Sequence, residues 1–166
     1  DRPIALTDLG TGSGAIALAL AVERPQAQIV ATDRSPAALT VARCNARRLG
    51  VHNVEFREGD WYEPLVGECF DLIAANPPYV AVTDSHRLHG ELRFEPRAAL
   101  VAGVSGLDAL RAIIAQAPFY LKPNGWLLLE HGYDQGEAVS ILFWERGFVT
   151  VSDHRDAAGM SRTSCG

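Results

Sequence analysis

The tetrapeptide Asn76-Pro77-Pro78-Tyr79 joins a hydrogen-bonding side chain to two rigid residues. It follows the apolar run 70–75, which is typical of a buried strand. Neither proline has an N–H to donate and both have a fixed φ, so ladder pairing cannot continue beyond the asparagine. The Asn76 carboxamide can accept a hydrogen bond through Oδ1 and donate two through Nδ2. At the end of a parallel strand, where open α/β sheets bind ligands, such a group suits an amide or amino substrate.

A glycine-rich turn joins the first predicted strand to the first predicted helix. Glycines at alternate positions allow positive φ angles and a close approach to a ligand, and the helix start leaves N–H groups facing it. Asp33 lies 19 positions after Gly14 and ends the next predicted strand. This is near the spacing of ~20 residues at which an acid reaches ribose hydroxyls in nucleotide-binding βαβ units. We therefore expect a ribose-containing cofactor, bound by Asp8, Gly10, Thr11, Gly12, Ser13, Gly14 and Asp33.

The glycine spacing narrows the choice of cofactor. The dinucleotide fingerprint is G-x-G-x-x-G, whereas this turn reads G-x-G-x-G, which disfavours pyrophosphate recognition. S-adenosylmethionine carries a carboxylate, an amine and a ribose but no phosphate, and fits better. Asp60 and Trp61 follow the third predicted strand. The Asp60 carboxylate could accept a hydrogen bond from the adenine amino group, and the Trp61 ring could pack on the adenine. In the alternative interpretation, Asp60 caps a turn and Trp61 belongs to the core.

Strands and helices alternate along most of the chain, which predicts a parallel sheet covered by helices on both faces. Ser35 is expected to cap the second helix, with Pro36 at its first position. A turn is predicted at 122–125, before the fifth strand. Predicted strands cover 4–9, 28–32, 53–57, 70–75, 126–130 and 148–152, and predicted helices 15–23, 36–49, 107–121 and 135–145.

The bulk properties indicate one globular domain, residues 1–166, with 48% apolar residues. No apolar run approaches a membrane span, and the first residues show no signal-peptide pattern. Cys44, Cys69 and Cys165 are scattered, so we expect reduced thiols and a cytoplasmic protein. The net charge of −5 argues against a large nucleic-acid footprint.

Residues 80–106 break the alternation. They exceed the usual length of a βα connection, and we expect a flap over the site. His86 and His89 beside Glu91 superficially resemble a metal site, but no cysteine or third histidine is near in sequence, and we expect no metal. Packing roles are assigned to Trp126, His131 and Trp144.

These motifs occur in the same order in the protein-(glutamine-N5) methyltransferases of peptide chain release factors, which the chain resembles over essentially its whole length. Asn-Pro-Pro-Tyr alone is shared with amino-directed DNA, RNA and protein methyltransferases. Arg-Phe-Glu-Pro at 93–96 and Glu-His-Gly at 130–132 are more specific. The remaining shared motifs are 8–14, Asp33 and Asp60-Trp61.

The resemblance implies a class I S-adenosylmethionine-dependent methyltransferase fold. This is an α/β, Rossmann-like fold with a mostly parallel, seven-stranded sheet, the last strand antiparallel, and helices on both faces. Residues 159–166 would form that last strand, and their weakly apolar sequence leads us to expect a frayed edge. The family's helical N-terminal domain, which contacts the release factor, is not part of residues 1–166, so these would be the catalytic domain.

The resemblance also implies S-adenosyl-L-methionine as methyl donor, S-adenosyl-L-homocysteine as product and a release-factor glutamine amide as acceptor. We hypothesise that Asn76 Oδ1 and the Pro77 carbonyl each accept a hydrogen bond from the amide nitrogen, while Tyr79 packs on the amide. Positioning and electrostatics would then supply most of the acceleration. Asn76 would also border the cofactor, and Pro78 would complete the substrate site.

Three alternatives stay open. The first is an N6-adenine DNA or RNA methyltransferase, because the exocyclic amine of adenine presents the same two protons to Asn-Pro-Pro-Tyr. Such an enzyme would need a basic groove for the nucleic-acid strand. A cofactor-binding module without catalysis and a nicotinamide-dependent oxidoreductase are the others. We expect a monomer that binds a release factor and has no direct nucleic-acid or membrane partner.

Overall fold

The computed structural model describes residues 3–79 and 106–166. The predicted flap, its Arg-Phe-Glu-Pro segment at 93–96, and His86, His89 and Glu91 lie outside the described residues. Seven strands form one sheet in the order β3-β2-β1-β4-β5-β7-β6. The expected seven-stranded sheet, with antiparallel pairing at its end, is therefore confirmed.

Two compact units make up the chain. The first consists of Asp1–Asn76 and Gln116–Leu128, and the second of Pro77–Ala115 and Leu129–Gly166.

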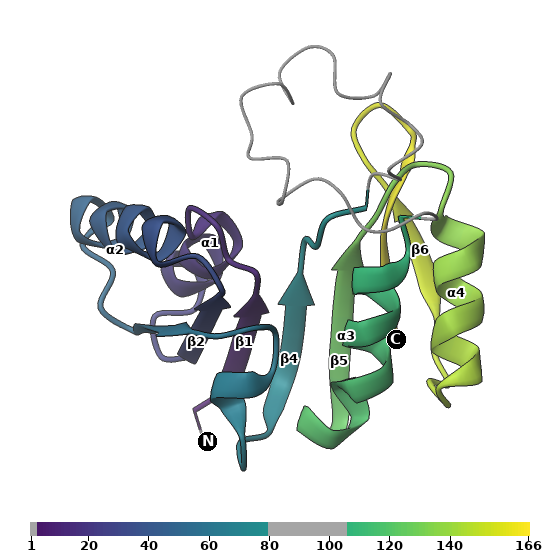
Figure 1. Ribbon diagram of the computed structural model, residues 1–166, viewed down its shortest axis with the longest axis horizontal. Helices are drawn as coiled ribbons and strands as arrows, with labels where there is room; N and C mark the ends of the chain where they lie inside the picture. Colours follow the sequence, from purple (N-terminus) through teal and green to yellow (C-terminus); the bar gives the residue numbers. More distant parts are fainter. Residues whose placement is uncertain (1–2, 80–105) are drawn as a thin grey trace. The chain divides into compact units, whose positions relative to one another are not determined.

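Strands β1 to β4 of the first unit pair in parallel (Figure 1). Leu9 at the end of β1 is in register with Thr32 of β2 and with Ala75 of β4. The chain thus builds β2 and β3 on one side of β1 and then returns to add β4 on the other side. This makes the carboxyl ends of β1 and β4 a topological switch point. The strands are β1 Ala5–Leu9, β2 Gln28–Asp33, β3 Val54–Glu58 and β4 Phe70–Ala75.

Helices α1 Ala15–Glu23 and α2 Pro36–Leu49 connect the first three strands. The predicted cap of α2 is confirmed, because Ser35 Oγ accepts a hydrogen bond from Ala38 N at 3.2 Å. Small side chains of α1 pack on β1 and β2, which lets the helix approach the sheet closely. The resulting core consists of Leu6, Ala17, Ala21, Ala27, Ile29 and Ala31.

Helix α3 Asp108–Tyr120 is followed directly by β5 Leu121–Glu130. The turn predicted at 122–125 is therefore wrong, although Asn124 keeps a left-handed φ of 62°. Lys122 Nζ lies 2.9 Å from Asp71 Oδ2 of β4, and this ion pair holds the start of β5 in place. The apolar stripe predicted for α3 is buried at Leu110, Ile113, Ile114 and Ala117.

The second unit ends with α4 Gly136–Glu145 and an antiparallel pair, β6 Ser152–Arg155 and β7 Ser161–Cys165 (Figure 1). The strand predicted at 148–152 is wrong, since the structure places β6 further along the chain. The expected frayed edge is also wrong, because β7 lies between β5 and β6. Its Arg162 carbonyl accepts from His131 N at 2.9 Å, and Ser164 is fully buried.

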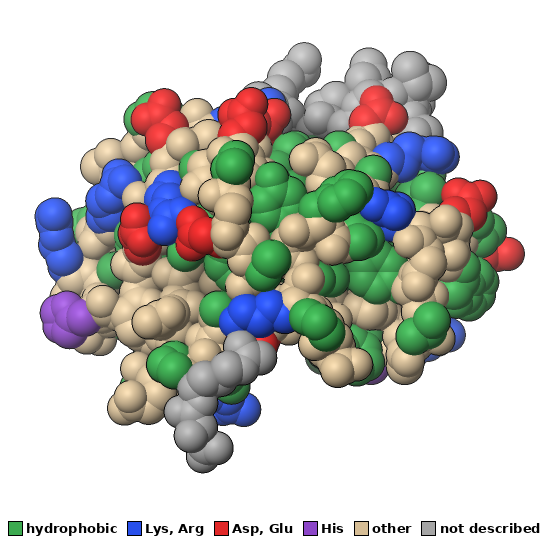
Figure 2. Space-filling view, turned by 90° about the horizontal axis from the view of Figure 1, so that it is seen from below, with side chains coloured by type: hydrophobic (Ala, Val, Ile, Leu, Met, Phe, Trp, Pro, Cys, Tyr) green, Lys and Arg blue, Asp and Glu red, His purple; other side chains and the backbone are tan. Residues whose placement is uncertain are grey.

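The surface carries acidic and basic side chains interspersed over the face drawn in Figure 2. Trp126 and Trp144 are 42% and 59% exposed, so the packing roles predicted for them are wrong. Cys44, Cys69 and Cys165 are free thiols. In the described ranges, every helix is too short or too polar to cross a membrane.

Candidate functional site

The carboxyl ends of β1 and β4 lie side by side, and both lead into predicted site residues. Leu9 pairs with Ala75, so Gly10 and Asn76 are the first residues beyond two neighbouring strands. The sequence alone does not place these two motifs next to each other, because they are 66 positions apart. The crossover at β1 does so, and it puts both at the switch point where open α/β sheets bind ligands.

The glycine turn adopts the backbone conformation that its sequence predicts. Gly10, Gly12 and Gly14 have φ angles of 69°, 57° and 87°, which side chains other than glycine rarely adopt. Thr11 N donates to the Thr32 carbonyl of β2 at 2.9 Å. A Cβ atom at Gly12 would have no heavy atom within 4 Å, so this part of the turn is open to a ligand.

Asp8 is a buried carboxylate beneath the turn, only 1% exposed. Its Oδ2 accepts from Thr11 Oγ1 at 2.6 Å and from Ala17 N, at the start of α1, at 3.0 Å. Its Oδ1 is buried without a hydrogen-bond partner among the residues described. Burial, with a smaller contribution from the nearby Asp33 charge, raises the pKa of Asp8 to about 6, although the hydrogen bonds from Thr11 and Ala17 lower it. Such an uncompensated buried carboxyl is suited to a cationic ligand.

Asp33 is a half-buried carboxylate at the end of β2. Its Oδ2 accepts from Gly12 N at 2.8 Å, and its Oδ1 accepts from Ser35 N at 2.8 Å. Each carboxylate oxygen can accept more than one hydrogen bond, so both keep capacity for a diol. The two backbone contacts hold the carboxylate in a fixed orientation beside the turn.

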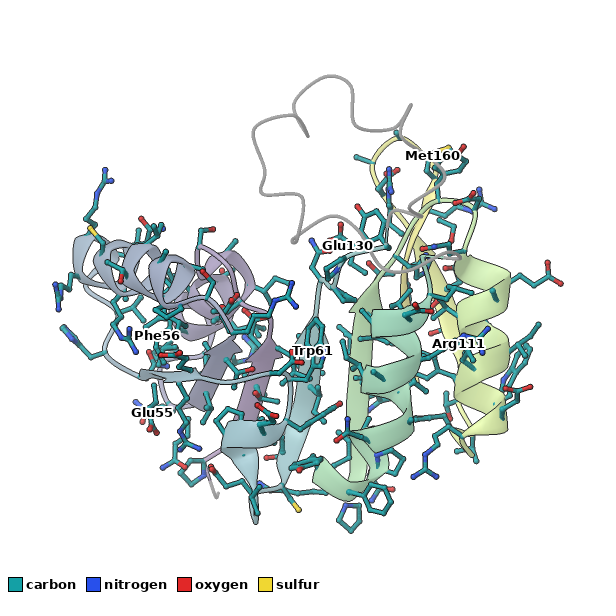
Figure 3. The ribbon with its side chains drawn as sticks, viewed as in Figure 1. Glu55, Phe56, Trp61, Arg111, Glu130 and Met160 are labelled. Carbon is teal, nitrogen blue, oxygen red and sulfur yellow. The ribbon has the colours of Figure 1, made fainter. Side chains whose placement is uncertain are left out.

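Trp61, labelled in Figure 3, lies against the glycine turn. A Cβ atom at Gly10 would come within 3.0 Å of its ring, so only glycine fits there without displacing the tryptophan. Trp61 itself has a φ of 46°, which is strained for a bulky residue and is the kind of conformation found at binding sites. Thr32 Oγ1 donates a hydrogen bond to the carbonyl of Trp61 at 3.0 Å. Asp60, next to it, is exposed, and its backbone N–H donates to Glu63 Oε2.

Asn76 is exposed directly after β4, while Pro77 is buried and Pro78 and Tyr79 are half-buried. Asn76 is the last residue of the first unit in this part of the chain, and the other three belong to the second unit. Asp8, Gly10, Gly12, Asp33 and Trp61 are thus brought together within the first unit.

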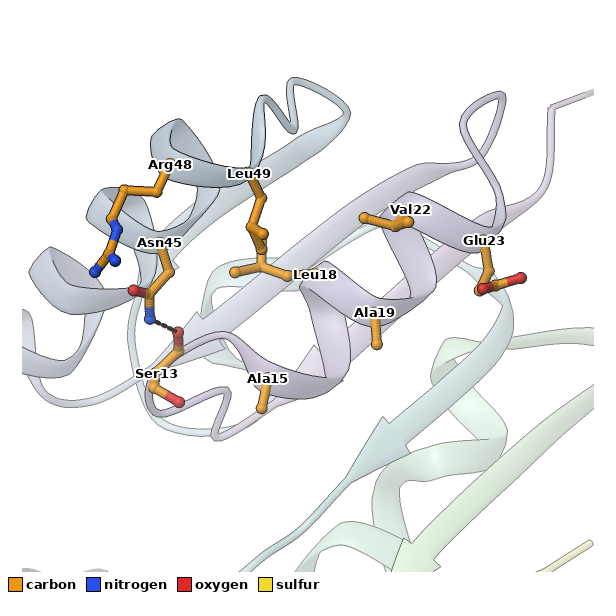
Figure 4. Close-up of a pocket in the computed structure, with 9 residues that line it drawn as sticks. All are labelled: Ser13, Ala15, Leu18, Ala19, Val22, Glu23, Asn45, Arg48 and Leu49. Carbon is orange, nitrogen blue, oxygen red and sulfur yellow. Dashed lines mark hydrogen bonds between the residues drawn. The ribbon is translucent and has the colours of Figure 1, made fainter.

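Two contributing residues were missed in the sequence. Asn45 of α2 donates from Nδ2 to the Ser13 carbonyl at 2.9 Å and so braces the glycine turn (Figure 4). Gln135 donates from Nε2 to the Tyr79 carbonyl at 3.1 Å. Both side chains bond to backbone carbonyls, so no sequence motif identifies these two residues.

The described residues offer less support for other candidate binding sites. A groove of about 700 Å³ lies between α1 and α2 (Figure 4), but Asp8, Asp33 and Asn76 do not line it. Across 3–79 and 106–166, no three His, Cys, Asp or Glu side chains are arranged to hold a metal ion. His131 has a packing role as predicted, fully buried and hydrogen-bonded to Ser164 Oγ at 3.0 Å.

Comparison with known proteins gives a consistent pattern. The profile of the family described as "Methyltransferase domain" matches residues 3–143. The chain is 58% identical to the release factor glutamine methyltransferase of Xylella fastidiosa strain 9a5c, over 97% of this chain and 58% of that protein. It is 45% identical to the protein of that name from Escherichia coli K12, over 100% of this chain and 60% of that protein. The resemblance seen in the motifs is confirmed.

The chain thus spans less than two thirds of the length of these relatives. Among solved structures, the T. thermophilus 16S rRNA N2 G1207 methyltransferase, in complex with AdoMet and guanosine, has a TM-score of 0.70 at 21% identity. That alignment covers 99% of this chain and 37% of the other. At this identity the likeness concerns the fold.

Proposed function

Because this chain belongs to the methyltransferase domain family, we propose that it transfers a methyl group from S-adenosylmethionine to a glutamine side-chain amide of a peptide chain release factor. The observation that carries the proposal is the pairing of β1 with β4. It puts the exposed Asn76, the first residue beyond β4, next to Gly10, the first residue beyond β1. A group able to hold an amide nitrogen therefore neighbours the expected methyl-donor site. The names of the relatives supply the choice of acceptor.

The residues around the turn fit S-adenosylmethionine. The unpartnered Oδ1 of buried Asp8 suits a ligand that carries positive charge, and the fixed Asp33 carboxylate suits ribose hydroxyls. Trp61 offers a ring face for the adenine, and exposed Asp60 an acceptor for its amino group. The open space at Gly12 admits a ligand close to the backbone. When bound, S-adenosylmethionine supplies an electrophilic methyl group on a sulfonium.

Asn76 and Pro77 orient the acceptor nitrogen. A primary amide nitrogen is a weak nucleophile because its lone pair is delocalised into the carbonyl. Asn76 Oδ1 and the Pro77 carbonyl each accept one of its N–H groups, which turns the lone pair toward the methyl group. No side chain in the described ranges hydrogen-bonds the Asn76 carboxamide, so it is available for this role. Pro78 stiffens the backbone and Tyr79 packs on the flat amide and excludes water.

The proposal extends to the compartment and the partners of the protein. Residues 1–166 act as the catalytic domain, in the cytoplasm, where release factors work, as a monomer without direct contact to nucleic acid or membrane. The chain's acidic balance, −5, supports a protein substrate over a nucleic acid. The N6-adenine methyltransferase alternative is not favoured, because the curated relatives are named for release factor glutamine.

Labelled S-adenosylmethionine tests the proposal. The purified protein is incubated with release factor, DNA, RNA or no acceptor, and labelled product is mapped by mass spectrometry. We expect label on one glutamine side chain of the release factor. Label on nucleic acid, or on no acceptor, refutes the proposal.

Variants of Asn76 test the catalytic assignment. Asn76→Ala removes the acceptor and should lower kcat by about 100- to 1000-fold. Its Kd for S-adenosylmethionine should stay within a factor of about two, since its ligand-holding neighbours are unchanged. Asn76→Asp keeps an acceptor oxygen and should retain more activity than the alanine variant. Wild-type turnover in Asn76→Ala would contradict the assignment.

A further inference from the structure

The side chain of Gln135 makes hydrogen bonds to three separate places in the second unit. Its Oε1 accepts from Gly132 N at 2.9 Å, and its Nε2 donates to the Tyr79 carbonyl at 3.1 Å and to the Gly106 carbonyl at 3.4 Å. An amide NH₂ has two hydrogens, so it can serve both carbonyls at once. One half-buried side chain thereby links residues that are 56 and 29 positions before it in the sequence.

The backbone of Gln135 is itself fixed. It stands at the N-cap position of α4, where its carbonyl accepts from Val139 N at 2.9 Å. Its side chain is not used to cap the helix and is therefore free to reach Tyr79. A Cβ atom at residue 132 would lie 3.0 Å from Gln135 Oε1, so glycine at that position leaves room for the contact.

His131 supports the other end of this arrangement. Its Nδ1 lies 2.9 Å from the Gly132 carbonyl, which can only accept, so the proton is on Nδ1. Its Nε2 lies 3.0 Å from Ser164 Oγ of β7 and 3.3 Å from Asp153 Oδ1 of β6. The ring is fully buried, so its hydrogen bonds fix the backbone of Gly132. The N–H of Gly132 in turn donates to Gln135 Oε1.

From this geometry we propose that Gln135 is a positioning residue for methyl transfer, which sets the backbone of Tyr79 and with it the Asn-Pro-Pro-Tyr turn. The inference rests on the proposed function, because it assigns Gln135 a role in that same reaction. All three hydrogen-bond partners of the Gln135 side chain, Gly132, Tyr79 and Gly106, belong to the second unit, and none of them is a predicted cofactor-binding residue. Removing its N–H donors therefore lowers kcat and leaves the Kd for S-adenosylmethionine unchanged.

Gln135→Glu separates the two halves of the amide. The variant keeps an oxygen for Gly132 N–H but replaces the donor to Tyr79 and Gly106 with a second acceptor. Gln26→Glu, at an exposed position after α1, makes the same change of charge and serves as the control. We expect Gln135→Glu to lower kcat at least tenfold, with the donor Kd within twofold of the wild type.

A second measurement does not depend on activity. In protein carrying carbonyl-¹³C tyrosine, the Tyr79 resonance, assigned with Tyr79→Phe, should move upfield in Gln135→Glu and stay in place in Gln26→Glu. If wild-type protein labels no release factor, the proposed function fails, and this resonance still tests the contact. An unchanged Tyr79 resonance, or a kcat of Gln135→Glu within twofold of the wild type, overturns the inference.

Discussion

Replacing Asp8 by asparagine should change how the free energy of unfolding depends on pH. Burial, assisted by the charge of Asp33, raises the pKa of Asp8 from 3.8 to about 6. The native state therefore keeps a proton on Asp8 at pH values where the unfolded chain has already released it. Stability is lost as pH rises through the pKa of Asp8 in the folded state. The asparagine variant lacks this ionisation and should lose less stability over the same range.

The size of the effect follows from the pKa difference. A difference of 2.2 units between 6 and 3.8 corresponds to about 3 kcal/mol when Asp8 is fully ionised, at 1.36 kcal/mol per unit. About half of this is already lost at pH 5, which leaves about 1 to 2 kcal/mol to be lost between pH 5 and pH 8. Asparagine places an unpaired N–H where Oδ1 now lies, but that cost does not vary with pH.

Urea unfolding at pH 5, 6, 7 and 8 measures the difference in unfolding free energy between Asp8→Asn and the wild type. We expect this difference to shift by about 1 to 2 kcal/mol in favour of the variant as pH rises. Glu23→Gln, exposed at the end of α1, removes one charge without altering a buried group and should show no such trend. A difference that stays constant within about 0.4 kcal/mol would refute the argument. The variant should also bind S-adenosylmethionine more weakly, because it offers a cation no carboxylate.

Two further predictions concern the turn. Asp33→Ala should weaken S-adenosylmethionine binding at least tenfold by calorimetry, since it removes the acceptor of Gly12 N–H and the expected ribose ligand; an unchanged Kd would show that the ribose assignment is wrong. Gly10→Ala and Gly12→Ala both place a side chain at positive φ and should each cost about 1 kcal/mol of unfolding free energy. Gly10→Ala should cost more, because only its Cβ meets Trp61, at 3.0 Å; equal losses would contradict that contact.

Local signals predicted the first half of the fold well. Ser35 and Pro36 start α2 as expected, because capping depends on residues within one turn of the helix. The glycine turn and Asp33 meet as expected, because a βαβ unit with a fixed crossover brings them together.

The second half depends on contacts distant in sequence and was predicted less well. The apolar stretch at 148–152 reads as a strand, yet Val149 is 94% exposed and the strand forms in the polar run that follows. Pairing with β7 decides its position there. Gln135 could not be identified for the same reason, since its partners at Tyr79 and Gly106 are adjacent to it only after folding.

The place of β7 between β5 and β6 has a consequence for the order in which the sheet is completed. β6 joins the sheet only through β7, so its hydrogen-bonding groups stay unpaired until Ser161–Cys165 have folded beside it. During that interval an apolar β6 would invite pairing with other nascent chains. The sequence Ser-Asp-His-Arg of β6 is polar and charged, which disfavours such pairing while the sheet is incomplete.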